Sequence, residues 1–360
     1  MKVLFVISCL SYGGAEKNLT TVANYLSRKH SVSICSFNEA DNVQQVSTNI
    51  KLFEMKRWVS NGKRFDWIQK RIAQYNYLNY VCNDIKPNLI ISFLPIPNVL
   101  AVICGNRNSI PVIISERADP YQRLSRLDYI IHHFYNKANG AVFQTNGAKE
   151  FYSKKLQKKS VVIPNPVIPN ASIIHNHINA KKEIAFVARF ENKQKRQDIA
   201  LKVIRNVVNK HPDYKLVFWG DGPDMEKIKA LAVQMNLRDN VVFAGVTDTV
   251  LDSIKHSELF LLTSDYEGIP NSLIEAMSIG LPCVATDCSP GGARLLIEDD
   301  SMGIIAPCGN VEQISRGVNY LIENKHIATK VGLNGRISLD RFNYDVIMEA
   351  WGEYVEQFAK

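Results

Sequence analysis

The chain has 360 residues, of which 46% are hydrophobic and 22% are charged, as in ordinary soluble globular proteins. A single hydrophobic core rarely serves more than about 250–300 residues, so we expect two domains. The seven cysteines form no C-x-x-C pair, which argues against a disulfide framework or a zinc site and favours a reducing compartment.

Positive charge is concentrated in the first half. Residues 1–165 contain 22 Lys and Arg and 10 Asp and Glu, a net +12, whereas residues 166–360 contain the remaining 21 and 25, a net −4. We expect the first half to face an anionic partner. No nucleic-acid-binding motif is present, which favours an anionic membrane surface, and a solvated basic face is the alternative interpretation.

Two apolar stretches are too short or too interrupted to cross a bilayer. Residues 1–10 are followed by no small-residue cleavage site, so they predict a first strand and not a signal peptide. Residues 89–104 contain Pro95 and Pro97, which excludes a transmembrane helix.

The first half alternates predicted strands and helices. We predict strands at 2–8, 30–37, 88–94, 110–116, 140–145 and 160–168, and helices at 13–29, 64–87, 98–106, 124–138 and 148–156. Residues 40–62 are polar and are predicted to be irregular. The Pro- and Asn-marked segment Pro166–Ala180 is the predicted linker, which gives domains at 1–168 and 178–340.

The second half repeats this alternation. We predict strands at 182–189, 214–220, 240–245, 258–264, 281–287 and 303–307, and helices at 197–210, 221–236 (capped by Asp221), 250–256 and 344–358, with one more inside 267–280. Both halves are therefore doubly wound parallel α/β sheets, which bind ligands at the carboxyl ends of their strands. Two such sheets facing each other would place a site between the domains.

The stretch EGIPNSLIEAMSIG, residues 267–280, joins two predicted strands through a loop and a helix. Pro270 suits the first turn of that helix. The N–H groups of Asn271, Ser272 and Leu273 would then be free to bind an anion such as a diphosphate. Glu267 and Glu275 are two carboxylates beside this anion site, and a pair of surface charges is the alternative interpretation.

Other strand ends carry charged residues or glycines. Arg189 ends the first strand of the second half and Lys195 follows it, so both cations would face the same anion site. In the first half, Gly13 and Gly14 follow the first strand, and Glu116 and Arg117 follow the fourth. Structural roles remain open for these four residues. No Asp-x-Asp pair or His motif indicates a metal, so we expect none.

The following motifs occur together in the chain: Gly13-Gly14-Ala15-Glu16, Val187-Ala188-Arg189-Phe190 with Lys195, Gly220-Asp221-Gly222-Pro223, Phe243-Ala244-Gly245, and Glu267-Gly268-Ile269-Pro270 through Glu275-Ala276-Met277. In this combination the chain resembles the family 4 retaining glycosyltransferases, which have the two-domain GT-B fold. It is most similar to bacterial enzymes that transfer hexoses or N-acetylhexosamines in surface polysaccharide or lipid-linked oligosaccharide assembly.

The resemblance implies two Rossmann-like domains facing across a cleft, with residues 1–168 binding the acceptor and 178–340 the nucleotide-sugar donor. The helix near 344–360 would pack back on the first domain. The implied donor-binding residues are Gly13, Gly14, Val246, Ile269, Pro270, Asn271, Ser272, Leu273 and Glu275, with Glu275 on the ribose and the backbone near Val246 at the base. The implied catalytic residues are Glu267 near the donor sugar, Arg189 and Lys195 at the departing phosphate, and Arg117 and Glu116.

One position departs from many members of the family. Arg117 occupies the place where they carry a His near the reacting sugar. Arginine cannot accept a proton at ordinary pH. Either Glu116 or the substrate phosphate would take the acceptor's proton, or Arg117 would only bind phosphate.

The leading hypothesis is transfer from a UDP-sugar, without metal or further cofactor, to a saccharide acceptor that is lipid-linked, at the inner face of the cytoplasmic membrane. The alternatives are a GT-B sugar-nucleotide epimerase and a non-catalytic nucleotide-sugar-binding subunit. A basic and aromatic segment would contact the anionic bilayer. It contains Lys56, Arg57, Trp58, Lys63, Arg64, Phe65, Trp67, Lys70 and Arg71. A helix whose aromatic residues face the core is the other interpretation of this segment.

Overall fold

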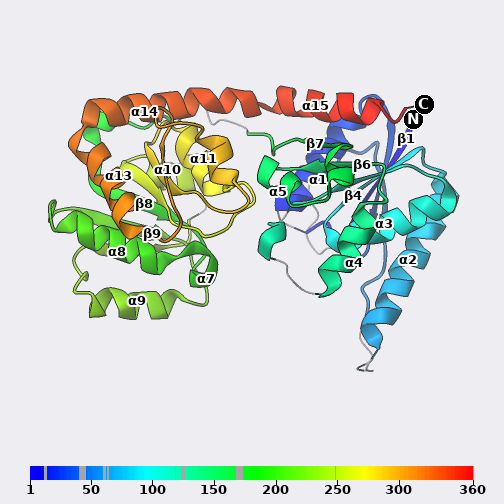
Figure 1. Ribbon diagram of the computed structural model, residues 1–360, viewed down its shortest axis with the longest axis horizontal. Helices are drawn as coiled ribbons and strands as arrows, with labels where there is room; N and C mark the ends of the chain where they lie inside the picture. The colour runs from blue at the N-terminus through cyan, green and yellow to red at the C-terminus, as the bar shows by residue number, and fades with distance from the viewer. Residues whose placement is uncertain are drawn as a thin grey trace. The chain divides into compact units, whose positions relative to one another are not determined.

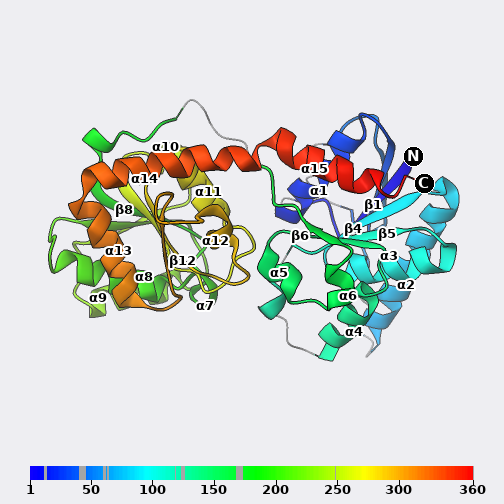
Figure 2. The ribbon, with the colours of Figure 1, turned by 45° about the horizontal axis from the view of Figure 1, so that its top comes forward.

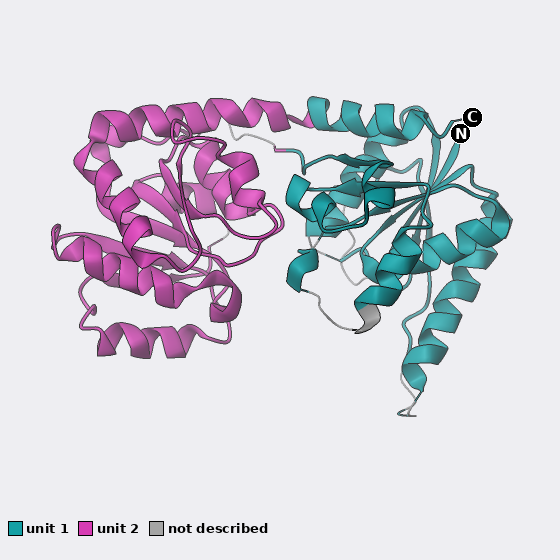
Figure 3. Ribbon diagram, in the orientation of Figure 1, with its two compact units in different colours: residues 1–166, 345–360 teal, residues 167–344 magenta. Residues whose placement is uncertain are grey.

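The structure of the protein, a computed structural model, describes residues 1–11, 14–39, 46–59, 62, 65–117, 119–122, 126–167, 173–247 and 249–359. The chain divides into two compact units (Figure 3). Unit 1 comprises residues 1–166 and 345–360, and unit 2 comprises residues 167–344. Among the described residues, no helix is both long enough and apolar enough to cross a membrane.

Unit 1 is built on a parallel sheet with the strand order β3-β2-β1-β4-β5-β6-β7. The strands are β1 (Lys2–Ile7), β2 (Ser31–Ser36), β3 (Lys51–Glu54), β4 (Leu89–Phe93), β5 (Val112–Ser115), β6 (Gly140–Phe143) and β7 (Ser160–Val162). Helices cover both faces of this sheet (Figures 1 and 2). They are α1 (Gly14–Leu26), α2 (Asp66–Ile85), α3 (Pro95–Asn108), α4 (Arg126–Tyr135), α5 (Asn146–Glu150), α6 (Lys154–Gln157) and α15 (Tyr344–Glu356), with a 3₁₀ turn, η1, at Pro120–Gln122.

Three predicted elements of unit 1 differ from the structure. The polar segment 40–62 contains the short edge strand β3, whose four residues were too few to produce a clear pattern. Helix α3 begins at Pro95, since a proline costs little in the first turn of a helix. The helix predicted at 148–156 is two helices, because the Ser153 side chain accepts the Leu156 N–H and starts α6.

Helix α15 packs on unit 1, far from its neighbours in sequence. Trp351 is fully buried and stacks on Phe93 with ring centroids 6.0 Å apart. The Tyr354 hydroxyl donates to Lys159 O at 2.7 Å and accepts from Ala141 N–H at 3.0 Å. Residues 345–360 therefore belong to unit 1.

Unit 2 has a second parallel sheet with the strand order β10-β9-β8-β11-β12-β13. The strands are β8 (Lys181–Val187), β9 (Lys215–Trp219), β10 (Val241–Gly245), β11 (Ser257–Leu262), β12 (Cys283–Thr286) and β13 (Ile304–Ala306). Its helices are α7 (Asn192–Lys195), α8 (Gln197–Val208), α9 (Met225–Gln234), α10 (Val250–Ile254), α11 (Asn271–Ser278), α12 (Gly292–Leu296), α13 (Val311–Glu323) and α14 (Lys325–Ser338), with the 3₁₀ turns η2 (His177–Asn179) and η3 (Leu339–Phe342).

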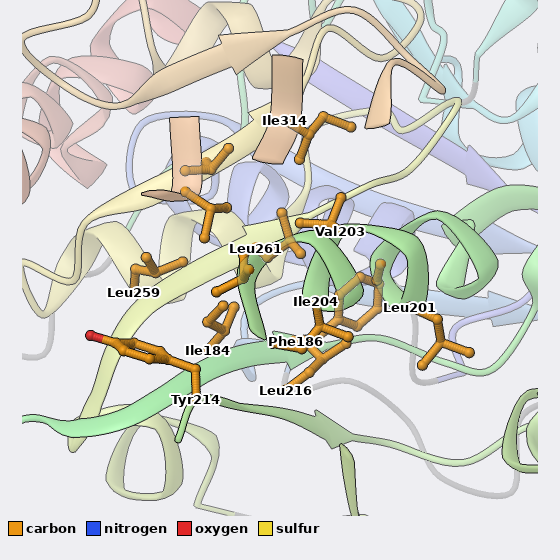
Figure 4. Packing of buried hydrophobic residues seen from close by; sticks show 14 of the residues in the cluster. Ile184, Phe186, Leu201, Val203, Ile204, Tyr214, Leu216, Leu259, Leu261 and Ile314 are labelled. Atoms are coloured by element: carbon orange, nitrogen blue, oxygen red, sulfur yellow. The ribbon is translucent and has the colours of Figure 1, made fainter. Parts of the chain in front are cut away.

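The core of unit 2 lies between the sheet and helices α8 and α13 (Figure 4). Ile184 and Phe186 of β8 pack with Leu216, Leu259 and Leu261 of neighbouring strands and with α8 (Figure 4). Burial of this apolar face fixes the register of the strands. Residues 187, 219 and 245 consequently end their strands at one edge of the sheet.

The loop after β9 differs from the prediction. Helix α9 begins after Asp224, and Asp221 does not cap it. Instead the Asp224 carboxylate accepts the Asn192 N–H at 2.8 Å, whereas Asp221 accepts the Gly222 N–H at 2.6 Å. A glycine is required at 222, because its φ is +159 and a Cβ would collide with the backbone of Phe190.

Candidate active site

A pocket of about 500 Å³ opens in unit 2 at the carboxyl ends of β8 and β9 and beside the start of α11. This volume is within the range of about 300–1,000 Å³ typical of small-molecule sites. Residues predicted from the sequence line much of it: Arg189, Lys195, Val246, Glu267, Ile269, Pro270, Asn271, Ser272 and Glu275. The structure therefore gathers in one place residues that lie as far apart in the chain as Arg189 and Glu275.

Glu267 and Lys195 form an ion pair in the wall of this pocket. Lys195 Nζ donates to Glu267 Oε1 at 2.5 Å, and the two side chains are 19% and 10% exposed. Ser264 Oγ donates to the same carboxylate oxygen at 2.8 Å. Charge-assisted hydrogen bonds are roughly twice as strong as neutral ones, so the carboxylate is held in a single orientation.

The loop that carries Glu267 is fixed by its backbone. The Glu267 N–H donates to Ser289 O at 2.7 Å, and Thr286 Oγ1 donates to Ser264 O at 2.5 Å. Gly292 packs directly against Gly268 O, where a Cβ would leave no room for the carbonyl. The loop is therefore pinned to the segment after β12.

Helix α11 presents its N-terminus to the pocket. Pro270 is the N-cap and not the first helical residue, and Asn271 and Ser272 line the pocket. The prediction that three N–H groups are free was wrong for Leu273, whose N–H donates to Pro270 O at 3.1 Å and whose side chain is buried in the core. Among the described residues, the N–H groups of Asn271 and Ser272 have no partner and remain available for an anion.

Arg189 lines the pocket but is far more exposed than Lys195. Its side chain is 68% exposed and lies 4.0 Å from the Glu191 carboxylate. An exposed pair at that distance is weak, so the guanidinium is free to turn toward an anionic ligand.

Trp219 is a pocket residue that the sequence analysis missed. It ends β9 and lines the pocket beside Val246, Thr247 and Val250. Its indole N–H is buried and has no hydrogen-bond partner among the described residues. The only signal in the sequence was that this tryptophan directly precedes Gly220. Gly220 packs closely on Ala188 O, which brings the ends of β8 and β9 together.

In unit 1, the predicted residues Glu116 and Arg117 directly follow β5. Glu116 is 1% exposed, and its carboxylate accepts from the Tyr135 hydroxyl at 2.9 Å and from the Arg117 N–H at 3.1 Å. Arg117 donates to Ser115 Oγ at 2.8 Å and to Asn165 Oδ1 at 3.2 Å. Burial lowers the pKa of Arg117 to about 9, and the Glu116 charge opposes that shift.

The guanidinium of Arg117 lies over two aromatic rings, 5.1 Å from the centre of Phe93 and 5.7 Å from that of Trp351. It thereby connects the end of β5 with α15. Gly14 begins α1, with open space where a Cβ would stand, and Gly13 lies outside the described residues.

In the described part of the chain, no three His, Cys, Asp or Glu side chains are arranged to hold a metal ion. The polar groups of the pocket include the Lys195–Glu267 ion pair, the exposed Arg189, two further carboxylates and the start of α11. Two cations and the free amides at the start of α11 therefore share the pocket with the carboxylates of Asp221, Glu267 and Glu275. Such a site suits a ligand with an anionic group and several hydroxyl groups.

Residues 168–338 match the family model described as glycosyl transferases group 1. The chain carries a group 1 glycosyl transferase domain. This domain coincides closely with unit 2 and contains the whole pocket.

Two relatives of this chain align with different shares of its length. An N-acetyl-D-galactosaminyltransferase of Campylobacter jejuni that acts on an undecaprenol-linked saccharide is 24% identical over 98% of this chain and 97% of its own length. An uncharacterised glycosyltransferase of Methanocaldococcus jannaschii is 30% identical over 64% of this chain and 63% of its own.

Solved structures confirm the predicted GT-B fold. The lipopolysaccharide outer core galactosyltransferase WaaB superposes with a TM-score of 0.83 at 19% identity and 99% coverage of both chains. Anabaena HepE in complex with UDP superposes with a TM-score of 0.81 at 17% identity, covering 99% of this chain and all of that one.

Proposed function

We propose that the protein is a retaining glycosyltransferase that moves a hexose or N-acetylhexosamine from a UDP-sugar to a lipid-linked saccharide. The observation that carries this proposal is the pocket of the group 1 domain, where the Lys195–Glu267 pair lies beside the free N–H groups of α11. The UDP bound to a solved structure of the same fold and the undecaprenol-linked acceptor of the Campylobacter relative support the two substrate classes.

The donor diphosphate lies at the start of α11 in this proposal. The N–H groups of Asn271 and Ser272 bind its oxygens, and Lys195 and Arg189 neutralise the charge that develops on the departing phosphate. Glu275 receives the ribose hydroxyls and Glu267 the hydroxyls of the sugar. The base lies near Val246 and Trp219.

Transfer then breaks the bond between C1 of the sugar and the phosphate oxygen while the acceptor hydroxyl oxygen bonds to C1 from the same face. The departing phosphate takes the acceptor's proton, so no protein base is needed. This assignment fits the burial of Glu116, whose carboxylate is occupied by Tyr135 and the Arg117 N–H. We propose that the reaction needs no metal, because two cations and a helix start can carry the phosphate charge.

The acceptor is proposed to reach the protein at a membrane surface through unit 1. Aromatic and aliphatic side chains at the start of α2 are exposed, among them Phe65 and Trp67 at 59% each. The basic residues Lys56 and Arg57 precede them and are exposed. Lys63 and Arg64, which belong to the same predicted segment, lie outside the described residues. Cations next to exposed aromatic rings suit an anionic bilayer interface.

Nucleotide-sugar binding is the first test. A ligand that binds only the folded state raises Tm, by an amount that corresponds to about 2.7 kcal/mol at 100 times its Kd. A panel of UDP-, GDP- and ADP-sugars should give its largest shift with one UDP-sugar, and Glu275→Ala should reduce that shift. Equal shifts with all three nucleotides, or none, would remove the UDP-sugar assignment.

Analysis of the reaction products distinguishes a retaining glycosyltransferase from a sugar-nucleotide epimerase. With a polyprenyl diphosphate saccharide as acceptor, the product should keep the donor's anomeric configuration, as read by NMR, and EDTA should leave the rate unchanged. An altered sugar nucleotide formed from the donor alone would instead identify an epimerase. An inverted anomer would refute retention.

Vesicle flotation tests the membrane surface. Reversing the charges of Lys56, Arg57, Lys70 and Arg71 should weaken binding to vesicles that contain anionic lipid and leave binding to neutral vesicles unchanged. Reversal of Lys154, Lys155 and Lys158 around α6 is the matched control in the same unit. If both variants lose vesicle binding equally, the net charge of the protein, and not the proposed segment, is responsible for the binding.

A further inference from the structure

Arg196 lies between α7 and α8 with φ +54 and ψ +48, in the left-handed region. Glycine is the residue that ordinarily adopts this conformation, because a Cβ is disfavoured there. A long cationic side chain at such a position is strained unless its contacts hold it. Residues held in this way concentrate at functional sites, so the contacts of Arg196 are informative.

The guanidinium of Arg196 bridges two carboxylates. Nε and Nη2 donate to the two oxygens of Asp198 at 3.0 and 3.2 Å, and Nη1 donates to Asp265 Oδ2 at 2.8 Å. The Arg196 side chain is 27% exposed, and those of its two partners are 19% and 33% exposed. The planar fork of arginine is what allows one side chain to hold both carboxylates.

This bridge joins the two segments that supply the Lys195–Glu267 pair. Gln194, Lys195 and Arg196 contact residues 265–267 one after another. The Gln194 carbonyl accepts the Asp265 N–H at 2.9 Å, and its side chain donates to Tyr266 O at 3.0 Å. Lys195 pairs with Glu267, and Arg196 pairs with Asp265.

Thr263 completes the contact from the end of β11. Its hydroxyl lies 2.9 Å from both Lys195 O and Arg196 O, so the carbonyls of the lysine and of the residue after it are anchored at the end of the strand that leads to Glu267. Lys195 therefore sits between two bound neighbours. Its Nζ has little freedom to leave the Glu267 carboxylate.

We propose that Arg196 is a positioning residue, which holds Lys195 and Glu267 at their mutual distance by bridging Asp198 and Asp265. Its role rests on the proposed function, because the pair it positions acts on the donor phosphate and sugar. Arg196 itself does not line the pocket. Its loss therefore leaves the proposed contacts to the ribose and to the helix start in place and displaces only the Lys195–Glu267 pair, which acts at the bond that breaks.

Arg196→Gly tests this directly, since glycine accepts the backbone conformation and removes only the bridge. Steady-state kinetics should show kcat lowered by about 10- to 100-fold, as expected for a misplacement on the order of 1 Å, with the KM for donor within about threefold of wild type. Arg196→Lys should recover little of the rate, because an ammonium cannot bridge both carboxylates.

Asp265→Asn is the second variant and weakens the same bridge from the other side, because its amide oxygen still accepts a hydrogen bond but carries no charge. If the two residues act as one unit, the double variant loses no more rate than the larger single loss. Fully additive losses would overturn the proposal. Asn236→Gly and Lys86→Gly are matched controls, since both residues have positive φ (57 and 52) and neither lines the pocket. Their kcat should equal that of wild type.

Hydrogen exchange gives a readout that needs no substrate. Backbone amides in residues 263–268 should exchange on the order of tenfold faster in Arg196→Gly and Asp265→Asn than in wild type and the two controls. Unchanged exchange there, or a folded Arg196→Gly protein with kcat within threefold of wild type, would overturn the inference. Absence of any sugar-nucleotide turnover by wild type would refute the proposed function instead, and faster exchange would then still support the bridge.

Discussion

Replacing Glu267 by alanine removes the carboxylate that Lys195 contacts at 2.5 Å and leaves an ammonium whose side chain is only 19% exposed. Breaking a buried ion pair from one side costs about 3–5 kcal/mol, because the remaining charge is uncompensated. Since Lys195 keeps some contact with water, we expect a destabilisation at the lower end of this range, about 3 kcal/mol. For a unit of this size that loss lowers Tm by about 6–12 °C.

The matched control is another ion pair of unit 2. Lys182 and Asp213 lie 2.8 Å apart, but their side chains are 60% and 74% exposed. Pairs of this kind are screened by water and contribute little, so Asp213→Ala should leave Tm unchanged within error. The comparison separates burial of a charge from mere loss of an ion pair.

Differential scanning calorimetry of Glu267→Ala, Lys195→Ala and the double variant gives the test. The double variant should be more stable than Glu267→Ala, because the stranded ammonium is gone. All three should turn donor over at least about 100-fold more slowly than wild type. If Glu267→Ala unfolds at the wild-type Tm, or if both alanine variants turn over normally, the reasoning about this pair is wrong.

Three further predictions concern other parts of the molecule. Trp351→Ala should destabilise unit 1 by about 3–5 kcal/mol in urea titration, because this fully buried ring stacks on Phe93; an unchanged midpoint would refute the docking of α15. His175 Nε2 lies 3.1 Å from His177 Nδ1, and burial lowers the pKa of both side chains, to about 4 for His177. Stability from this neutral pair should therefore be complete above about pH 6.5 and fall as the pH approaches 4, and His177→Gln should flatten that dependence in thermal scans. Trp219→Phe removes a buried N–H without a described partner, so the free protein should be at least as stable while affinity for UDP, measured by calorimetry, falls by roughly tenfold; unchanged affinity would show that the indole N–H is not used.

Local sequence patterns were sufficient for most of the fold. Apolar runs bounded by Gly, Pro and Asn predicted the strands, and helical periodicity predicted the long helices, because both depend on residues close together in the chain. The rule that parallel strands share a carboxyl edge then brought Arg189, Lys195 and Glu267 to one side of a sheet. Short elements such as β3 escaped, since four residues carry too little pattern.

Only the tertiary structure decided which side chains touch. The sequence placed Lys195 and Glu267 in the same site, but their ion pair joins residues 72 positions apart, and the Arg196–Asp265 contact spans 69. Likewise, the burial of Glu116 beside Tyr135 depends on packing that no local pattern encodes. Residue types and spacing determine the strands and helices, whereas side-chain partners and burial arise from long-range contacts.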